Sequence, residues 1–153
     1  MQHLHRALEP ILRRLSALLG RAVVSRVDDA RRLQALQLSG LAGERLDGVE
    51  SFQAYGLTSS PPIGSEALLA CIGGQREHAI ALGVAHRESR PRNLAAGEVT
   101  LYSQHGQSVK LKADGSIELV SESSIKLTVG GNSIELAGSG VTITSPTGTT
   151  TFQ

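Results

Sequence analysis

The sequence is short of the residues that many small proteins use to cross-link or fill a fold. Among 153 residues there is one cysteine, Cys71, so no intrachain disulfide can form and folding needs no oxidising compartment. Tryptophan is absent, and aromatic residues make up 3 % of the chain: Phe52, Tyr55, Tyr102 and Phe152. So few aromatic residues argue against a protein that stacks nucleic-acid bases. A net charge of +1 likewise offers no excess of basic residues to a polyanion.

Long apolar runs and catalytic motifs are also missing. No uncharged apolar run is long enough to cross a bilayer, and the charged N-terminus lacks the small-residue cleavage site of a signal peptide. There is no Gly-x-Ser-x-Gly elbow, no phosphate-binding glycine loop and no carboxylate pair in a recognisable motif. His78 and His86 flank a predicted strand near Glu77, an arrangement that arises far more often by chance than by catalysis. We therefore expect no enzyme, no cofactor and no metal site.

The charged residues divide the chain. All twelve arginines lie between Arg6 and Arg92, whereas the three lysines (Lys110, Lys112 and Lys126) lie beyond them. The change follows the stretch RESRPRNLAAGE, whose proline and arginines are typical of a linker. Three regions are predicted: an N-terminal amphipathic helix (1–20), a barrel domain (21–96) and a repetitive β region (97–153).

The first region has the apolar spacing of one helical face. Pro10 is expected in the first turn of the firm part of this helix, and Gly20 at its end. A short helix with so narrow a stripe must pack on something, either its own domain or copies of itself. The apolar residues of the stripe are Leu4, Leu8, Ile11, Leu12, Leu15, Leu18 and Leu19.

The second region contains five short runs that read as strands separated by turns: RAVVSRV, LQALQLSG, VESFQAYGLTS, SEALLACI and HAIALGVAH. CIGGQREH is predicted to form a hairpin turn, because its two glycines can adopt positive φ. Five strands in so few residues match a small Greek-key barrel such as the OB-fold. Nucleic-acid binding is disfavoured, because the arginines are interleaved with acids: Arg31 and Arg32 next to Asp28 and Asp29 indicate a solvated, self-paired surface.

From Ser108 the chain repeats in lines of eight or nine residues, each with an apolar, polar, apolar triplet. This period of two predicts strands with one apolar face, punctuated by glycines. Each strand turns too few apolar side chains inward to offset the loss of backbone entropy, so such repeats are stable only when stacked. The residues predicted to form the core are Val109, Leu111, Ile117, Leu119, Ile125, Leu127, Ile134, Leu136, Val141 and Ile143.

Three copies wound around one axis would bury these residues and leave no open sheet edge. Each chain would then supply one wall of a triangular prism. The alternative is a plain β-meander that completes the barrel domain. We favour the trimer, because a meander does not need a fixed repeat length.

Three motifs carry a family resemblance: YGLTSSPPIGSEAL, CIGGQREH and GEVTLYSQHG. With the stretch around them, from about Arg21 to Leu119, they resemble the baseplate spike proteins of Mu-like phages with contractile tails. The resemblance implies a mainly β homotrimer: an N-terminal helix, an OB-fold-like hub below the tail tube, and a C-terminal triple-stranded intertwined β-helix. Such a needle pierces the host outer membrane when the sheath contracts.

The resemblance also implies partners and a location. The expected partners are the tail tube or hub, the baseplate wedge proteins, a separate tip protein and, transiently, the host outer membrane, with no nucleic acid. The location is the virion tail baseplate, assembled in the host cytoplasm. Related spikes often end in a His-x-His pair that binds iron. Here no histidine follows His105, and the pair His3 and His5 lies at the wrong end, so no iron site is expected.

Two other functions stay open. One is an OB-fold module that binds an oligonucleotide or saccharide, with the repeats as a trimerisation stalk. The other is the hub of a secretion or injection system. The sequence alone does not separate either from a phage tail.

Overall fold

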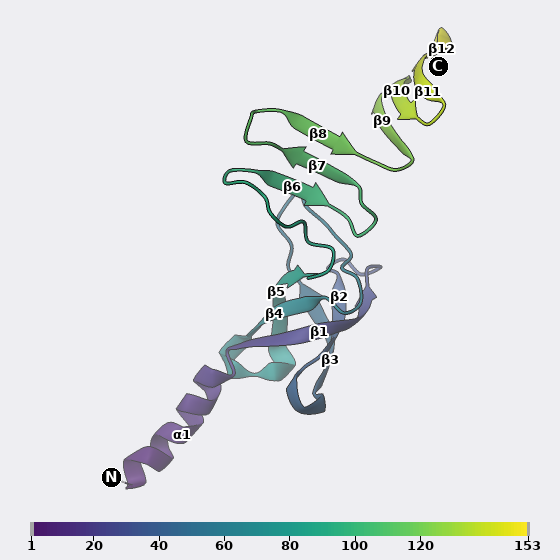
Figure 1. Cartoon of the computed structure of the whole chain (residues 1–153). Helices are drawn as coiled ribbons and strands as arrows, with labels where there is room; N and C mark the ends of the chain where they lie inside the picture. The colour runs from purple at the N-terminus through teal and green to yellow at the C-terminus, as the bar shows by residue number, and fades with distance from the viewer. Residues whose placement is uncertain (1, 153) are drawn as a thin grey trace. The chain divides into compact units, whose positions relative to one another are not determined.

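The structure is a computed structural model that describes the backbone of residues 2–152 and the side chains from Leu8 onward except Arg13 and Ala42. The chain divides into two compact units, one ending at Glu88 and one beginning at Ser89. The first unit contains a helix and a closed barrel, and the second contains two antiparallel sheets (Figure 1). The prediction of a mainly β protein with an N-terminal helix is confirmed.

Helix α1 (Gln2–Ser16) ends earlier than the predicted 1–20. Pro10 lies inside the helix rather than in its first turn. Gly20 is not a helix terminator, because strand β1 (Leu19–Asp28) already includes it. A Cβ at Gly20 would lie 3.0 Å from Nη1 of Arg76, the end of a long side chain that would have to shift slightly.

Five strands close the barrel in the order β1-β2-β3-β5-β4. Strand β1 pairs antiparallel with both β2 (Ala35–Ser39) and β4 (Glu66–Cys71). A short parallel pairing of β3 (Arg45–Ser51) with β5 (Ala79–Ala85) completes the ring. The barrel interior is filled by small and aliphatic side chains: Ala22, Val24, Leu36, Leu38, Val49, Ala67, Leu69, Cys71, Ala79 and Ala81.

The third predicted strand, 49–59, is wrong in its bounds. The observed strand, β3, begins at Arg45, before the apolar alternation starts, and contains Gly48, which has a positive φ. It stops at Ser51 because the following residues form a loop held by side chains. Gln53 accepts from the backbone N–H of Ser59 at 2.6 Å, and the buried Gln34 donates to the carbonyl of Ser59 at 2.9 Å.

The predicted turn CIGGQREH does connect two antiparallel strands, β4 and β5. It contains two short 3-10 helices, η2 (Ile72–Gly74) and η3 (Arg76–His78), and positive φ at both glycines. The side chain of Arg76 donates from Nε to Oε1 of Glu44 at 2.6 Å. Glu44 directly follows a further 3-10 helix, η1 (Leu41–Gly43), so this pair ties the β4–β5 connection to the β2–β3 connection.

The second unit is built of meanders, in which each strand pairs with the next along the chain. The first sheet contains β6 (Val99–Tyr102), β7 (Ser108–Leu111) and β8 (Ile117–Val120). The second contains β9 (Ser124–Val129), β10 (Asn132–Ala137), β11 (Gly140–Ser145) and β12 (Gly148–Phe152). Each repeat of the sequence therefore forms one strand and its turn.

Candidate functional site

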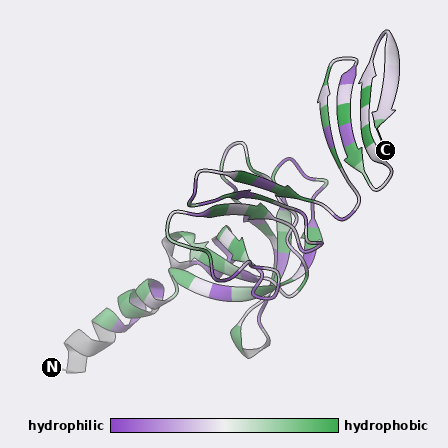
Figure 2. Cartoon of the chain, turned by 45° about the horizontal axis from the view of Figure 1, so that its top comes forward, coloured by the Kyte–Doolittle hydropathy of each residue, from purple (hydrophilic) through white to green (hydrophobic). Residues whose placement is uncertain are grey.

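The β9–β12 sheet has one apolar face, and its register aligns the apolar residues of successive strands. One row across the sheet contains Ile125, Leu136, Val141 and Phe152, and the next contains Leu127, Ile134, Ile143 and Thr150. Directly opposed residues of an antiparallel pair lie on the same face, as do residues two apart in one strand. Figure 2 shows the hydrophobic residues as green bands across this sheet.

The β6–β8 sheet repeats the arrangement with three strands. Its register places Val99, Leu111 and Ile117 in one row, and Leu101, Val109 and Leu119 in the next. These rows are two residues apart on every strand, so they share a face. Both sheets of the second unit thus present one face made almost entirely of valine, leucine and isoleucine.

The opposite faces carry charged and hydroxyl side chains. In the β6–β8 sheet the Nζ of Lys110 lies 3.0 Å from Oε2 of Glu98. This bond is the main reason that the pKa of Glu98 lies below its usual value. In the β9–β12 sheet Lys126 pairs with Glu135 at 3.4 Å, and the hydroxyls of Thr142 and Thr151 lie 3.2 Å apart. This alternation makes each sheet polar on one side and apolar on the other.

The apolar faces are not covered within one chain. None of the described residues from Ser89 to Phe152 is buried. Of the ten predicted core residues, seven are 41–65 % exposed, and Val109, Ile125 and Val141 are partly exposed. The barrel, by contrast, contains all the buried apolar side chains of the described chain. The second unit therefore has the alternation of a folded sheet without the core that normally stabilises one.

All ten residues that the sequence singled out lie on these two apolar faces. The register adds three that the prediction left out: Val99 and Leu101 in β6, and Phe152 in β12. The signal for β6 was present, because VTL has the same apolar, polar, apolar triplet as the repeats. It was missed because β6 precedes the first regular repeat.

The last described strand, β12, contains no histidine, cysteine or carboxylate. Strand β12 offers threonine hydroxyls and the phenyl ring of Phe152, and no imidazole. Among the described residues, no group of three or more His, Cys, Asp or Glu side chains is placed to hold a metal ion. The described helix is also too short and polar to span a bilayer.

The barrel surface shows paired charges rather than a basic groove. Arg31 donates to Asp28 at 2.9 Å, as the sequence suggested for this surface. Arg87 donates to Glu66, and this hydrogen bond is the main reason that the pKa of Glu66 is lowered. The aromatic ring of Tyr55 is fully exposed on the loop after β3.

Comparison with known proteins gives three matches. A family model described as Bacteriophage Mu Gp45, N-terminal, matches residues 21–88, which span the barrel. The chain is 44 % identical over 112 residues to the baseplate puncturing device gp45 of Escherichia phage Mu, covering 73 % of this chain. It is 38 % identical over 146 residues to the Mu-like prophage FluMu protein gp45 of Haemophilus influenzae, covering 95 % of this chain. These matches span 57 % of the Mu protein and 78 % of the Haemophilus protein, so the chain spans less than two thirds of the former.

Proposed function

Because the chain belongs to the family of Mu-like phage baseplate spike proteins, we propose that three copies of it form the central spike of a contractile tail. The protein is a structural component of the virion tail baseplate and not an enzyme. Its relative in phage Mu is named a baseplate puncturing device. The proposal adds the trimer, the interlocked needle and the piercing of a host outer membrane.

The observation that carries the trimer is the pair of uncovered apolar faces in the second unit. Full burial of a valine, leucine or isoleucine contributes roughly 1.5–3 kcal/mol. The ten predicted core residues are about half exposed, so completing their burial would contribute roughly 7–15 kcal/mol per chain. Three identical sheets placed around one axis, apolar faces inward, supply this burial with a single repeated contact.

The meander topology suits such a prism. Each sheet is a wall of one chain with an apolar and a polar side, and three walls enclose a core that none of them has alone. Only the outermost strands of each sheet, β6 and β8 or β9 and β12, keep an unpaired edge, and in the proposed needle these edges are expected to pair with strands of the other chains. The outward faces then carry the ion pairs and threonines described above.

The barrel is proposed to be the OB-fold hub of the spike. The closed barrel of five strands, with β1 between β2 and β4 and a parallel β3–β5 pairing, supports this assignment. Tail-tube or hub proteins and baseplate wedge proteins are the expected neighbours of this part. The needle is expected to meet a tip protein and, on sheath contraction, the outer membrane.

The first test is the mass of the full chain in solution, by size exclusion with light scattering. A mass of three times 16.1 kDa is expected. A matched pair of variants then locates the interface. Ile125→Asp places three carboxylates near the axis and is expected to abolish the trimer, because like charges in a dry core are strongly unfavourable. Thr128→Asp adds the same charge on the opposite face and is expected to leave the trimer intact.

A monomeric wild-type chain would refute the proposal. A stable Ile125→Asp trimer would show that the apolar faces do not point to the axis. Loss of the trimer in both variants, with the barrel still folded by circular dichroism, would mean that neither face tolerates charge, and would refute the outward assignment of the polar side.

A further inference from the structure

The apolar stripe of α1 repeats with the spacing of a coiled coil. Leu8, Ile11 and Leu15 are three and four residues apart, which places them at positions a, d and a of a heptad. Leu12 lies beside them at position e. All four side chains are 43–58 % exposed. The main contact of α1 with the barrel is η2, so the barrel leaves this stripe largely uncovered.

The core positions of this heptad carry no charge. Glu9 lies at b, away from the a/d line, whereas Arg14 lies at g, which borders the core and can keep its guanidinium in solvent. Pro10 lies at c, on the far side of the helix, so its missing N–H does not disturb a close approach along the seam. An apolar e position widens the stripe beyond that of a two-helix coil, and leucine at a with isoleucine at d favours three or more helices.

The base of the helix is fixed on its own barrel. A Cβ at Gly74 would lie 2.6 Å from the carbonyl oxygen of Arg14, so only glycine permits this contact. The N–H of Cys71 donates to the carbonyl of Leu18 at 2.7 Å, which holds the segment between α1 and β1. These two contacts give α1 a defined direction relative to its barrel.

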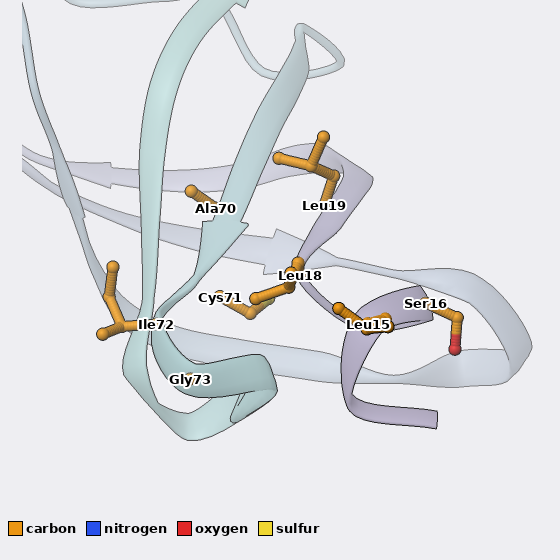
Figure 3. A pocket seen from close by; sticks show the side chains of 8 residues that line it. All are labelled: Leu15, Ser16, Leu18, Leu19, Ala70, Cys71, Ile72 and Gly73. Atoms are coloured by element: carbon orange, nitrogen blue, oxygen red, sulfur yellow. The ribbon is translucent and has the colours of Figure 1, made fainter. Parts of the chain in front are cut away.

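The apolar surface of the helix continues onto the barrel. A shallow groove beside the helix end is lined by Leu15, Leu18 and Leu19 on one side and Ala70, Cys71 and Ile72 on the other (Figure 3). Ile72 is exposed. The last turn of a neighbouring helix that lies along the stripe of α1 would therefore contact apolar side chains of this groove and not solvent.

We propose that the α1 helices of three copies form a parallel three-helix bundle, with Leu8, Ile11 and Leu15 facing its axis. This proposal rests on the trimer of the proposed function and names a second interface within it. Symmetry favours copies of α1 as the occupants, because each barrel presents the same helix in the same direction. Within a trimer the three helices also share a high effective concentration, which offsets the shortness of each one.

Disulfide cross-linking of the full chain tests the bundle. In a Cys71→Ala background, Ile11→Cys places three thiols at one d layer, and Glu9→Cys places them at the outward b position as the matched control. Oxidised trimers are then run on a denaturing, non-reducing gel. We expect Ile11→Cys to form linked dimers at least tenfold faster than Glu9→Cys, because two of three axial thiols can pair. Leu8→Cys repeats the test if Ile11→Cys disturbs assembly.

The outcomes separate this proposal from the proposed function. A trimer by light scattering whose d-position and b-position thiols cross-link at the same slow rate would refute the bundle and leave the spike intact. A monomer would refute the spike, and the bundle with it. Fast linkage at Ile11→Cys or Leu8→Cys, with slow linkage at Glu9→Cys, would support both.

Discussion

Replacing Gly74 with alanine is expected to push α1 away from the barrel. Gly74 has φ +72°, and its added Cβ would lie 2.6 Å from the carbonyl oxygen and 3.0 Å from the Cα of Arg14. Ordinary van der Waals contact begins near 3.4 Å, so the last turn of α1 must retreat by about 0.8 Å, the difference between 3.4 and 2.6. A gap of that size removes roughly a quarter to a half of the van der Waals attraction at each contact between α1 and the barrel.

Gly73→Ala is the matched control, because Gly73 has φ +64° and its added Cβ would meet nothing within 4 Å. Both variants carry the left-handed backbone penalty of about 1–2 kcal/mol. Gly74→Ala is expected to cost about 1 kcal/mol more, for the lost helix contacts. This corresponds to a roughly fivefold larger fraction of molecules in which α1 has separated from the barrel.

Limited trypsin digestion measures this separation, since cleavage after Arg14 requires the last turn of α1 to leave the barrel and unfold locally. We expect cleavage at Arg14 to be about five times faster in Gly74→Ala than in Gly73→Ala, with the barrel intact in both. Equal cleavage rates in the two variants would refute the close packing of α1 on Gly74. Because the backbone penalty is common to both variants, it does not enter the comparison.

Two further predictions concern the barrel. The hydrogen bond from Arg76 lowers the pKa of Glu44, so this carboxylate stabilises the fold above its ordinary value of 4.5, and the stabilisation is lost as pH falls below it. Urea unfolding midpoints should fall between pH 5 and pH 3, and less steeply in Glu44→Gln; an unchanged slope in that variant would contradict the assignment. Gln34→Ala should destabilise the barrel by about 0.5–1.5 kcal/mol and speed proteolysis of the 52–64 loop, because it removes the hydrogen bonds of a buried amide to Asp29 and to the carbonyl of Ser59. An unchanged rate of proteolysis would contradict the role of Gln34 in holding this loop.

The strands of the β region could be predicted from the sequence, because period-two alternation is a local property. Each triplet of the repeat became one strand, and the ten chosen residues fell on one face of their sheets. What covers those faces is not a local property. It depends on contacts beyond the strand itself, and the exposed apolar faces are the observation that supports the proposed trimer.

The errors lie where tertiary contacts override local pattern. Gly20 resembled a helix terminator, but it lies within strand β1 and pairs with Leu69 of β4, a segment far along the chain. The alternation after Ser51 resembled a strand, but Gln34 and Gln53 hold that segment as a loop. The pairing of β1 with β4 and the hydrogen bond from Gln34 to Ser59 could not be foreseen, because each joins residues whose proximity only the closed barrel creates.

The proposed piercing role requires that little charge enters the bilayer, and the charge distribution of the β9–β12 sheet meets this requirement. Permanent charge is expensive in the hydrocarbon of a bilayer, and the sequence carries no charged residue after Glu135. The charged side chains of the β9–β12 sheet, Lys126 and Glu135, pair with each other. Beyond them the polar face carries threonine hydroxyls, such as those of Thr142 and Thr151, that satisfy one another. Such a surface is wettable without being charged, so a spike that stays soluble in water would still bring little unpaired charge into the membrane.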